Sequence, residues 1–416
     1  MKHQRTEASS AMTQLRLNWK NTFIIGLGFF GVGLVWPLYN AYMPIFYARY
    51  IEAKATIGYL MTIDNWLALT LTPLVGFLSD RTRTRFGRRI PYLLVFAPLS
   101  ALFLMLIPVG WETSLWLLLG AAVLMNLSMA CWRSPIVALM PDVTPPPLRS
   151  KANGIINFMG GLAYIVAMFG GAILYRMYPG LPFVASALLL LGITAIFYFF
   201  IREPEHSTEK SERFQFALIR DRSAIFMLLA IFCWFVAYNS LETWVTTYGR
   251  EHLGMHEADV AGLLTFSGGA FLLFAIPSGF LADGIGRFKG LGRKRTILGG
   301  LLLMILAFFL LDLQANLKSA WYLFALVGFA WSWVNINSYP MITQMAGPGQ
   351  IGAYTGMYYL FSSMANIAGP PLFGWVFDHY GYRFFFPLGI LFMALAALCM
   401  LLVTKGEKEP AAEARA

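Results

Sequence analysis

Nearly the same motif occurs twice in this chain, about two hundred residues apart, and it constrains the fold more than any other feature. The copies occupy residues 76–89 and 279–294, and each begins Gly-Phe-Leu-Ser/Ala-Asp and ends in Gly-Arg-Arg/Lys. Each copy stands where a long apolar run meets a basic cluster, so it marks a helix leaving a bilayer on the cytoplasmic side. We therefore expect two copies of one membrane module, an organisation typical of transporters.

The composition fits a chain that is embedded largely in lipid. Of the 416 residues, 58% are hydrophobic and only 12% are charged, and a soluble fold could not hide that much apolar surface. The net charge of +10 is spread over loops between apolar runs, so we expect no nucleic-acid partner. Each of Cys131, Cys233 and Cys399 lies inside an apolar run, which argues against a disulfide or zinc framework, and we expect no metal site.

Counting apolar runs of membrane-spanning length predicts an all-α integral membrane protein with twelve transmembrane helices in two pseudo-symmetric six-helix bundles. The predicted spans are residues 21–47, 56–78, 90–108, 114–140, 152–175, 181–201, 224–248, 259–282, 296–312, 319–341, 351–377 and 383–404. The corresponding domains are a cytoplasmic N-terminal tail (1–20), the first bundle (21–201), a cytoplasmic linker (202–223), the second bundle (224–404) and a cytoplasmic tail (405–416).

The distribution of lysine and arginine predicts the orientation. With an even number of spans both termini lie on one side, and most of the basic loop residues fall on that same side. Basic loops stay in the cytoplasm, so both termini are expected there, in the inner or plasma membrane of the cell. The N-terminal segment lacks the apolar core of a cleavable signal, and we expect it to remain attached as a tail.

The doubled motif and the twelve spans resemble the major facilitator superfamily over essentially the whole chain. The finer pattern is the first motif (76–89), Leu-Met-Pro-Asp at 139–142 and the run from Arg149 to Gly161, which resembles the sucrose/proton symporters and the glycoside, pentoside and hexuronide cation symporters. The resemblance implies the major facilitator fold and transport of a disaccharide or other glycoside with a proton. The first helix, Val-Trp-Pro-Leu-Tyr-Asn at 35–40, departs from the plant sucrose carriers, so the resemblance does not name the sugar.

Ionisable groups deep in a membrane are costly and are functional candidates by default. Asp64 lies 16 residues from Asp80 on the second span, roughly 24 Å along a helix and well inside the hydrocarbon. Desolvation makes such a carboxylate bind a proton more readily, so Asp64 is our first candidate for the proton-coupling acid. The alternative is a carboxylate satisfied by Asn65 or Thr62 that serves only packing.

Arg133 in the fourth span is the candidate for substrate binding. It lies nine residues, or roughly 13 Å, from Asp142 at the cytoplasmic end, and its planar head can hold sugar hydroxyls or a carboxylate. The substrate-binding arginine of the sucrose carriers that this chain resembles also lies in the fourth helix. Since Asp64 lies about 10 Å farther out along its helix, we expect no direct ion pair. The alternative role for Arg133 is to neutralise a buried partner.

The resemblance also implies that the first, fourth, seventh and tenth helices line a central cavity. These spans carry aromatic rings and amides, which suit an uncharged sugar better than an anion. The predicted substrate-binding residues there are Tyr39, Asn40, Asn239, Asn335 and Asn337, with interfacial belts or helix packing as the alternative role. Glu242, near the outer end of its span, is a candidate vestibule residue or second proton-coupling site, and a solvated carboxylate is the alternative.

The doubled motif predicts a latch. An acid at a helix end followed by arginines can pair with a neighbouring helix and hold one face of a transporter shut. The predicted gating residues are Asp80, Arg88 and Arg89 in the first motif and Asp283 and Arg293 in the second. The alternative is that these charges only fix topology against anionic lipid.

Together these observations predict a secondary transporter that imports a neutral glycoside, such as sucrose or maltose, with a proton by alternating access. A single membrane acid in the first half, Asp64, favours a proton, with sodium coupling as the alternative. Two rival functions are a non-transporting sugar sensor and a drug/proton antiporter. No phosphate-binding loop or membrane-enzyme motif is present, so we expect no enzyme and no cofactor, and a monomer whose partners are the glycoside and the bilayer.

Overall fold

The computed structural model describes residues 17–145, 148–201, 203, 221–284, 289–347 and 350–407. These residues fold almost entirely into helices, with one isolated bridge between Thr84 and Gly87. A long apolar chain in a bilayer must satisfy its backbone groups internally, and a helix does so. Within the described residues, eleven helical segments are long and apolar enough to cross a membrane. α13 (Ile351–Tyr380) is equally long but is not among those eleven.

The helices follow the twelve predicted spans. Those of the first half are α2 (Trp19–Ala48), α3 (Lys54–Leu60), α4 (Ile63–Arg81), α5 (Ile90–Thr113), α6 (Leu115–Val143), α7 (Arg149–Met177) and α8 (Leu181–Phe200). Those of the second half are α9 (Arg222–Glu251), α10 (Glu257–Asp283), α11 (Arg293–Asp312), η2 (Leu317–Ala320), α12 (Trp321–Gln344), α13, η3 (Tyr382–Phe384) and α14 (Phe385–Leu402).

The ends of the helices differ by a few residues from the predicted domain boundaries. The first helix begins at Trp19, inside the tail predicted for 1–20, and α9 begins at Arg222, inside the linker predicted for 202–223. Asn18 and Asp221 explain these starts, because each side chain accepts a backbone hydrogen bond at the N-cap of its helix. Most of the predicted linker and of both predicted tails lies outside the described residues.

The second predicted span, 56–78, is not one helix. α3 ends at Leu60 and α4 starts at Ile63, although together they cover the length of one span, Lys54–Arg81. Thr62 lies in the break, where its hydroxyl donates to the Tyr59 carbonyl oxygen at 2.8 Å and tightens the turn. Asp64 consequently lies in the first turn of α4 rather than in the middle of a helix.

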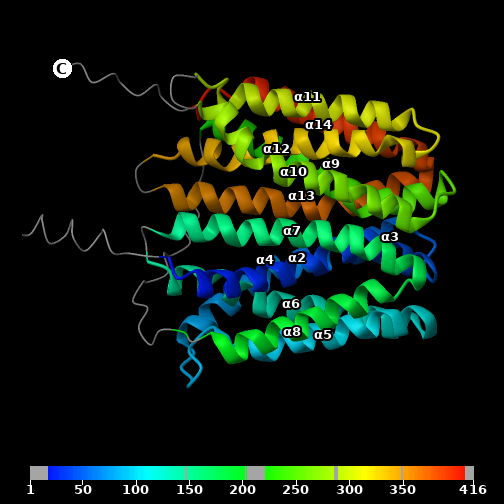
Figure 1. The fold of residues 1–416 in the computed structure, drawn as a ribbon. Helices are drawn as coiled ribbons and strands as arrows, with labels where there is room; N and C mark the ends of the chain where they lie inside the picture. The colour runs from blue at the N-terminus through cyan, green and yellow to red at the C-terminus, as the bar shows by residue number, and fades with distance from the viewer. Residues whose placement is uncertain are drawn as a thin grey trace, which may run out of the picture.

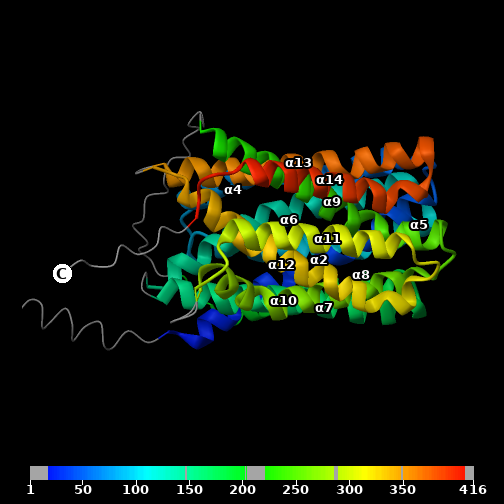
Figure 2. The same cartoon turned by 90° about the horizontal axis from the view of Figure 1, so that it is seen from above.

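The two halves lie side by side with their helices running in one common direction (Figures 1 and 2). The main contacts between the halves are those of α7 with α10, α3 with α13, and α2 with α9, and α4 also contacts α13. Both basic motifs, and the start of α2 and end of α14, lie at one end of the molecule, on the left of Figure 1. We call this the basic end and the opposite end the far end.

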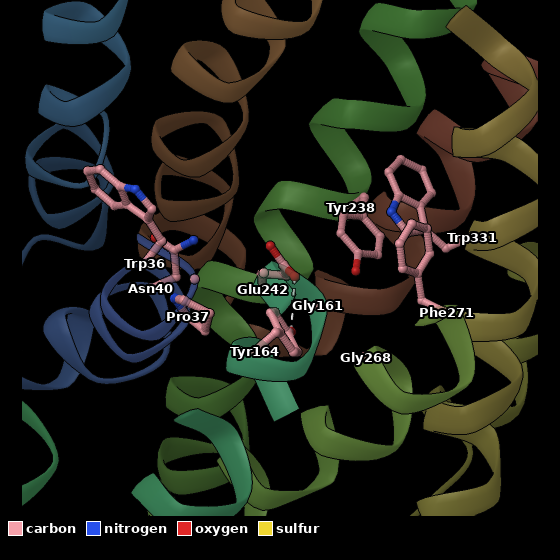
Figure 3. A pocket seen from close by; sticks show the side chains of 12 residues that line it. Trp36, Pro37, Asn40, Gly161, Tyr164, Tyr238, Glu242, Gly268, Phe271 and Trp331 are labelled. Atoms are coloured by element: carbon pink, nitrogen blue, oxygen red, sulfur yellow. Dashed lines mark hydrogen bonds between the residues drawn. The ribbon is translucent and has the colours of Figure 1, made fainter. Parts of the chain in front are cut away.

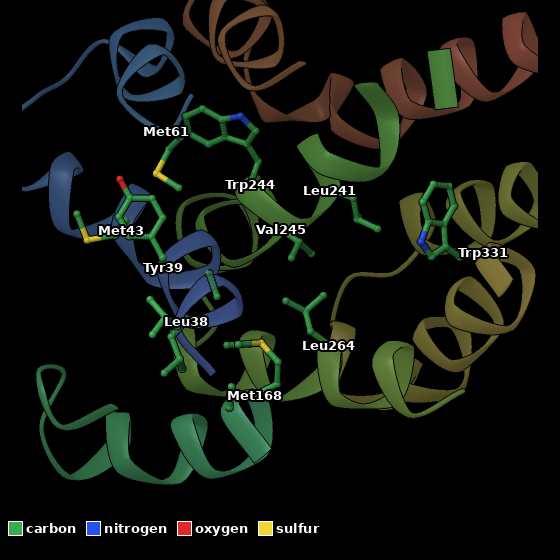
Figure 4. Close-up of a cluster of buried hydrophobic side chains, with 14 of the residues drawn as sticks. Leu38, Tyr39, Met43, Met61, Met168, Leu241, Trp244, Val245, Leu264 and Trp331 are labelled. Atoms are coloured by element: carbon green, nitrogen blue, oxygen red, sulfur yellow. The ribbon is translucent and has the colours of Figure 1, made fainter. Parts of the chain in front are cut away.

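Large apolar side chains from both halves meet between the helices (Figure 4). Tyr39 and Met43 of α2 and Trp244 and Val245 of α9 are buried in this cluster. Close van der Waals packing of such side chains is a main favourable contribution to helix association inside a folded membrane protein. The cluster thereby joins α2 of the first half to α9 of the second half.

Candidate functional site

A cavity of about 360 Å³ lies between the two halves (Figure 3). Its size falls in the range of small-molecule sites. Five helices supply its walls, and the residues are Gly33, Trp36, Pro37 and Asn40 of α2, Gly160, Gly161 and Tyr164 of α7, Tyr238 and Glu242 of α9, Gly268 and Phe271 of α10, and Trp331 of α12.

One wall of the cavity is aromatic. Tyr238 and Trp331 stack with ring centroids 4.0 Å apart and planes 5° apart, and Phe271 lies beside them. Flat ring faces of this kind bind apolar surfaces and the C–H faces of sugars. Across the cavity, the Trp36 indole nitrogen is buried and has no hydrogen-bond partner among the described residues. The cavity thus offers ring faces together with polar atoms.

Glu242 is the one carboxylate among the residues lining this cavity. The Tyr164 hydroxyl donates to its Oε1 at 3.1 Å, from the other half of the molecule. Within the described part of the chain, no lysine, arginine or histidine nitrogen lies within 4.0 Å of it. Glu242 is nine residues from the end of α9, roughly 13 Å. It is therefore deeper than the vestibule position predicted from the sequence.

The predicted substrate residues divide between the cavity and the helix packing. Asn40 lines the cavity, whereas Asn239, next to the lining residue Tyr238, is half-buried outside that lining. Tyr39 is fully buried and its hydroxyl accepts a hydrogen bond from Asn126 at 3.1 Å. Asn337 donates to the Trp333 carbonyl at 2.9 Å, and Asn335 is half-buried away from the lining.

Asp64 and Arg133 face one another across α4 and α6 without touching. Their charges are close enough to influence each other, but they form no ion pair within 4.0 Å among the described residues. The Asn65 side-chain amide donates to Asp64 Oδ1 at 2.7 Å. Asn65 is one of the two hydrogen-bond partners that the sequence suggested for a purely structural Asp64. Arg133 is not among the residues that line the cavity, and no other residue of α6 is, so α6 does not line the cavity as expected.

Arg133→Lys is expected to raise the substrate concentration for half-maximal uptake by about tenfold, since lysine keeps the charge but loses the planar pair of donors. The measurement is the concentration dependence of uptake in proteoliposomes. Arg250→Lys is the matched control, because Arg250 pairs with Glu257 within the second half, outside the cavity. An unchanged half-maximal concentration in Arg133→Lys would count against a substrate role for Arg133.

The predicted latch residues form an ion-pair cluster at the basic end. Arg89 pairs with Asp80 at 2.5 Å and with Asp142 at 3.1 Å, and Arg88 pairs with Asp142 at 2.7 Å. All of these residues belong to the first half. In this structure the cluster therefore ties α4, α5 and α6 to one another rather than to the second half.

The second motif repeats the same construction. Arg293 pairs with both oxygens of Asp283 at 3.0 Å. Glu407, just after α14, accepts the backbone N–H groups of Arg293 and Lys294 at 2.8 and 2.9 Å. Among the described residues, the ion pairs at the basic end stay within one half.

The sequence interpretation missed the acid that follows the last helix of each half. Glu203 accepts the backbone N–H groups of Arg88 and Arg89, both at 2.8 Å, as Glu407 does in the second half. In both motifs a glycine with positive φ, 103° at Gly87 and 87° at Gly292, bends the loop onto this acid. A glutamate soon after the last apolar run of each half was the available signal.

Glu203→Ala is expected to cost about 2–3 kcal/mol of stability, because it leaves the backbone N–H groups of Arg88 and Arg89 without their acceptor. The Glu203 side chain is only 1% exposed, whereas Glu407 is exposed. Glu407→Ala is therefore the control and should cost less. Thermal unfolding of the purified protein in detergent measures both, and equal losses would contradict the prediction.

At the far end the contacts do cross between the halves. Asp378 of α13 accepts the backbone N–H groups of Lys54 and Ala55 at 2.8 and 2.9 Å, so the second half caps α3. The Lys54 ammonium group also pairs with Glu251 of α9 at 3.4 Å. Arg176 of α7 pairs with Asp259 of α10. Apart from the Tyr164–Glu242 hydrogen bond in the cavity, these polar contacts between the halves lie at the far end.

Glycines bring the backbones together at this end. A Cβ atom on Gly58 of α3 would lie 2.4 Å from the Pro370 carbonyl oxygen, and one on Gly374 of α13 would lie 2.4 Å from the Lys54 carbonyl oxygen. The Trp244 indole donates to the same Pro370 oxygen at 3.0 Å. Small residues commonly allow helix backbones to approach this closely in membrane proteins.

Two helical halves around a central cavity, fastened to each other at the far end, define an integral membrane transporter rather than an enzyme. The family model described as Major Facilitator Superfamily matches residues 22–291 and 263–416. The chain belongs to this superfamily. Its fold also matches the crystal structure of a mutant of the nucleoside transporter NupG with a TM-score of 0.76, at 14% identity and over 93% of this chain and 100% of that one.

The chain is similar to curated transporters with different named substrates. It is 25% identical to Multidrug resistance protein 2 of Bacillus subtilis (strain 168), over 94% of this chain and 97% of that protein. It is also 25% identical to the isoprimeverose transporter of Lactiplantibacillus pentosus, over 73% and 68%. A putative glycoside/cation symporter YagG of Escherichia coli (strain K12) is 38% identical over 20% of this chain and 18% of that protein.

Proposed function

We propose that this protein imports a neutral glycoside, such as a disaccharide, in symport with a proton. The observation that carries the proposal is the cavity between the halves, which combines the stacked Tyr238 and Trp331 with Asn40, Glu242 and Trp36 as polar partners. Aromatic faces with a few well-placed hydrogen-bonding groups suit a ring bearing hydroxyls. The similarity to an isoprimeverose transporter and to a glycoside/cation symporter supports this substrate class.

The orientation and the coupling ion are part of the same proposal. Basic loops favour the cytoplasm, so the basic end with both termini faces the cytoplasm in the inner or plasma membrane. With the far-end contacts formed, the molecule described here is then inward-facing. Asp64 carries the coupled proton, Glu242 is a second protonation site, and Arg133 binds the sugar as it passes toward the basic end. A monomer suffices, because each half contributes to one cavity.

Drug/proton antiport is the second candidate function. Its support is the full-length similarity to Multidrug resistance protein 2 and a carboxylate among aromatic rings, which also suits a lipophilic cation. The direction of proton movement separates the two functions. A symporter carries protons with its substrate, and an antiporter carries them against it.

The test uses purified protein in liposomes that enclose a pH-sensitive dye, in sodium-free buffer. Sucrose, maltose, melibiose, trehalose and isoprimeverose are added in turn, and ethidium is the lipophilic cation. Internal acidification on adding a sugar supports proton symport and names the substrate. Acidification only when sodium is present contradicts proton coupling, and a proton flux driven by ethidium alone contradicts the glycoside assignment. Liposomes containing Arg133→Lys protein provide the reduced-affinity comparison.

A further inference from the structure

Tyr164 is the one first-half residue lining the cavity that donates a hydrogen bond to a carboxylate of the second half, among the residues that the structure describes. It lies near the middle of α7, and its hydroxyl donates to Glu242 Oε1 at 3.1 Å. Figure 3 shows the two side chains meeting between the helices. This is a different kind of contact from the far-end ion pairs, because it forms within the site itself.

The ring of Tyr164 is also seated in the second half. A Cβ atom on Gly268 of α10 would lie 2.4 Å from Cδ1 and 2.6 Å from Cε1 of Tyr164. Only glycine leaves room for the ring at that position. Gly269, the next residue, has nothing within 4 Å of its Cβ position. The tyrosine is therefore fixed at two points, by the Gly268 surface and by the carboxylate.

Two tyrosine hydroxyls approach the Glu242 carboxylate. Tyr238, on the same helix as Glu242, is the other titratable side chain lining the cavity and also hydrogen-bonds this carboxylate, whereas Tyr164 is the donor that reaches it from the other half. The linings from α2, α10 and α12 contain no titratable side chain, and no basic nitrogen of the described residues lies within 4.0 Å of Glu242. A hydrogen bond to a charged carboxylate is roughly twice as strong as one to a neutral group. The strength of the Tyr164 contact thus depends on the proton on Glu242.

We propose that Tyr164 is a positioning residue that holds Glu242 against the cavity and links the proton on Glu242 to the contact between the two halves. The inference rests on the proposed function in that Glu242 is a protonation site of the transport cycle. It adds a residue from a helix that the sequence interpretation did not include, and it assigns the Gly268 surface as the seat for the ring.

The first test needs no substrate. Infrared difference spectra of the purified full-length protein are recorded as the pH is changed, and the Glu242 carboxyl band is the one lost in Glu242→Gln. Tyr164→Phe keeps the ring on Gly268 but removes the donor. We expect this band to shift in frequency and its titration midpoint to move by about one pH unit. Tyr178→Phe is the control, since Tyr178 donates to Glu112 at 2.6 Å on the exposed surface.

A double-mutant cycle in proteoliposomes shows whether Tyr164 acts through Glu242. Tyr164→Phe is expected to lower the maximal rate of proton-driven uptake several-fold in the parent protein and to have no further effect in Glu242→Gln. Gly268→Ala should reproduce the loss, because its Cβ atom displaces the ring, whereas Gly269→Ala should not.

The outcomes separate this inference from the proposed function. An unshifted carboxyl band in Tyr164→Phe, or losses from Tyr164→Phe and Glu242→Gln that simply add, overturns the positioning role even if a glycoside is transported. If no glycoside is transported, the proposed function fails, while the infrared titration still decides whether Tyr164 holds Glu242.

Discussion

Replacing Asp64 with asparagine is expected to abolish uphill accumulation of the substrate while sparing exchange. Asparagine keeps the size and can still meet Asn65, but it cannot carry a proton. With one proton per substrate, a gradient of about one pH unit supports about tenfold accumulation, and the ratio in the variant should fall to about one. The measurement is radiolabelled sugar uptake with and without an imposed pH gradient.

Exchange of labelled for unlabelled sugar provides the control for folding of the Asp64 variant. Exchange requires binding and the movement of the loaded carrier, but not the release of the proton. The variant should therefore retain exchange within a few-fold of the parent protein. Continued tenfold accumulation in Asp64→Asn would remove Asp64 as the coupling acid and leave Glu242 as the remaining candidate.

The second large effect is expected at the far end, where Gly58→Ala should disfavour the inward-facing state. Its Cβ atom would meet the backbone of Pro370 at 2.4 Å, and neither helix can yield without separating α3 from α13. Overpacking of this kind costs about 1–3 kcal/mol. That energy shifts the balance of the two states by about 5- to 150-fold, and uptake should fall accordingly.

Chemical labelling measures this shift. A cysteine at Asn40, which lines the cavity, replaces the asparagine in a protein without Cys131, Cys233 and Cys399. A membrane-impermeant maleimide added at the far end should react faster in the Gly58→Ala protein. Gly170→Ala on α7 is the control, because its Cβ position has nothing within 4 Å. Equal labelling of both proteins would show that the close contact at Gly58 does not hold the far end shut.

Much of the fold could be predicted from the sequence because the membrane imposes one requirement everywhere. Each apolar run of sufficient length must form a helix, so the number and order of the spans followed from hydrophobicity alone. The break between α3 and α4 could not be predicted in this way. It lies at Thr62, whose hydroxyl donates to the Tyr59 carbonyl oxygen, and no hydrophobic pattern marks that position. The N-terminal cap of α3 could not be predicted either, because Asp378 is more than three hundred residues away and meets Lys54 and Ala55 only when the two halves are together.

The kinds of residue in the site could be predicted from the sequence, but which individual residues line the cavity could not. The sequence indicates which helices carry aromatic and amide side chains, and Asn40 and Glu242 do line the cavity. Which face of each helix turns toward the cavity depends on packing between helices. Tyr39 precedes Asn40 in the sequence, but its side chain contacts Asn126 and does not line the cavity. Tyr164 and Phe271 come from helices that the resemblance did not include, and no local pattern marks them.

The acid that follows the last helix of each half has a mechanical consequence. Glu203 and Glu407 each follow the last helix of a half and bind the loop between the second and third spans of that same half. The first and last parts of each half are therefore held together. A unit closed in this way resists internal deformation, and its motion relative to its neighbour becomes that of a rigid body. Two separately synthesised halves are then expected to assemble into one molecule through the helix contacts between them, such as α7 with α10 and α3 with α13.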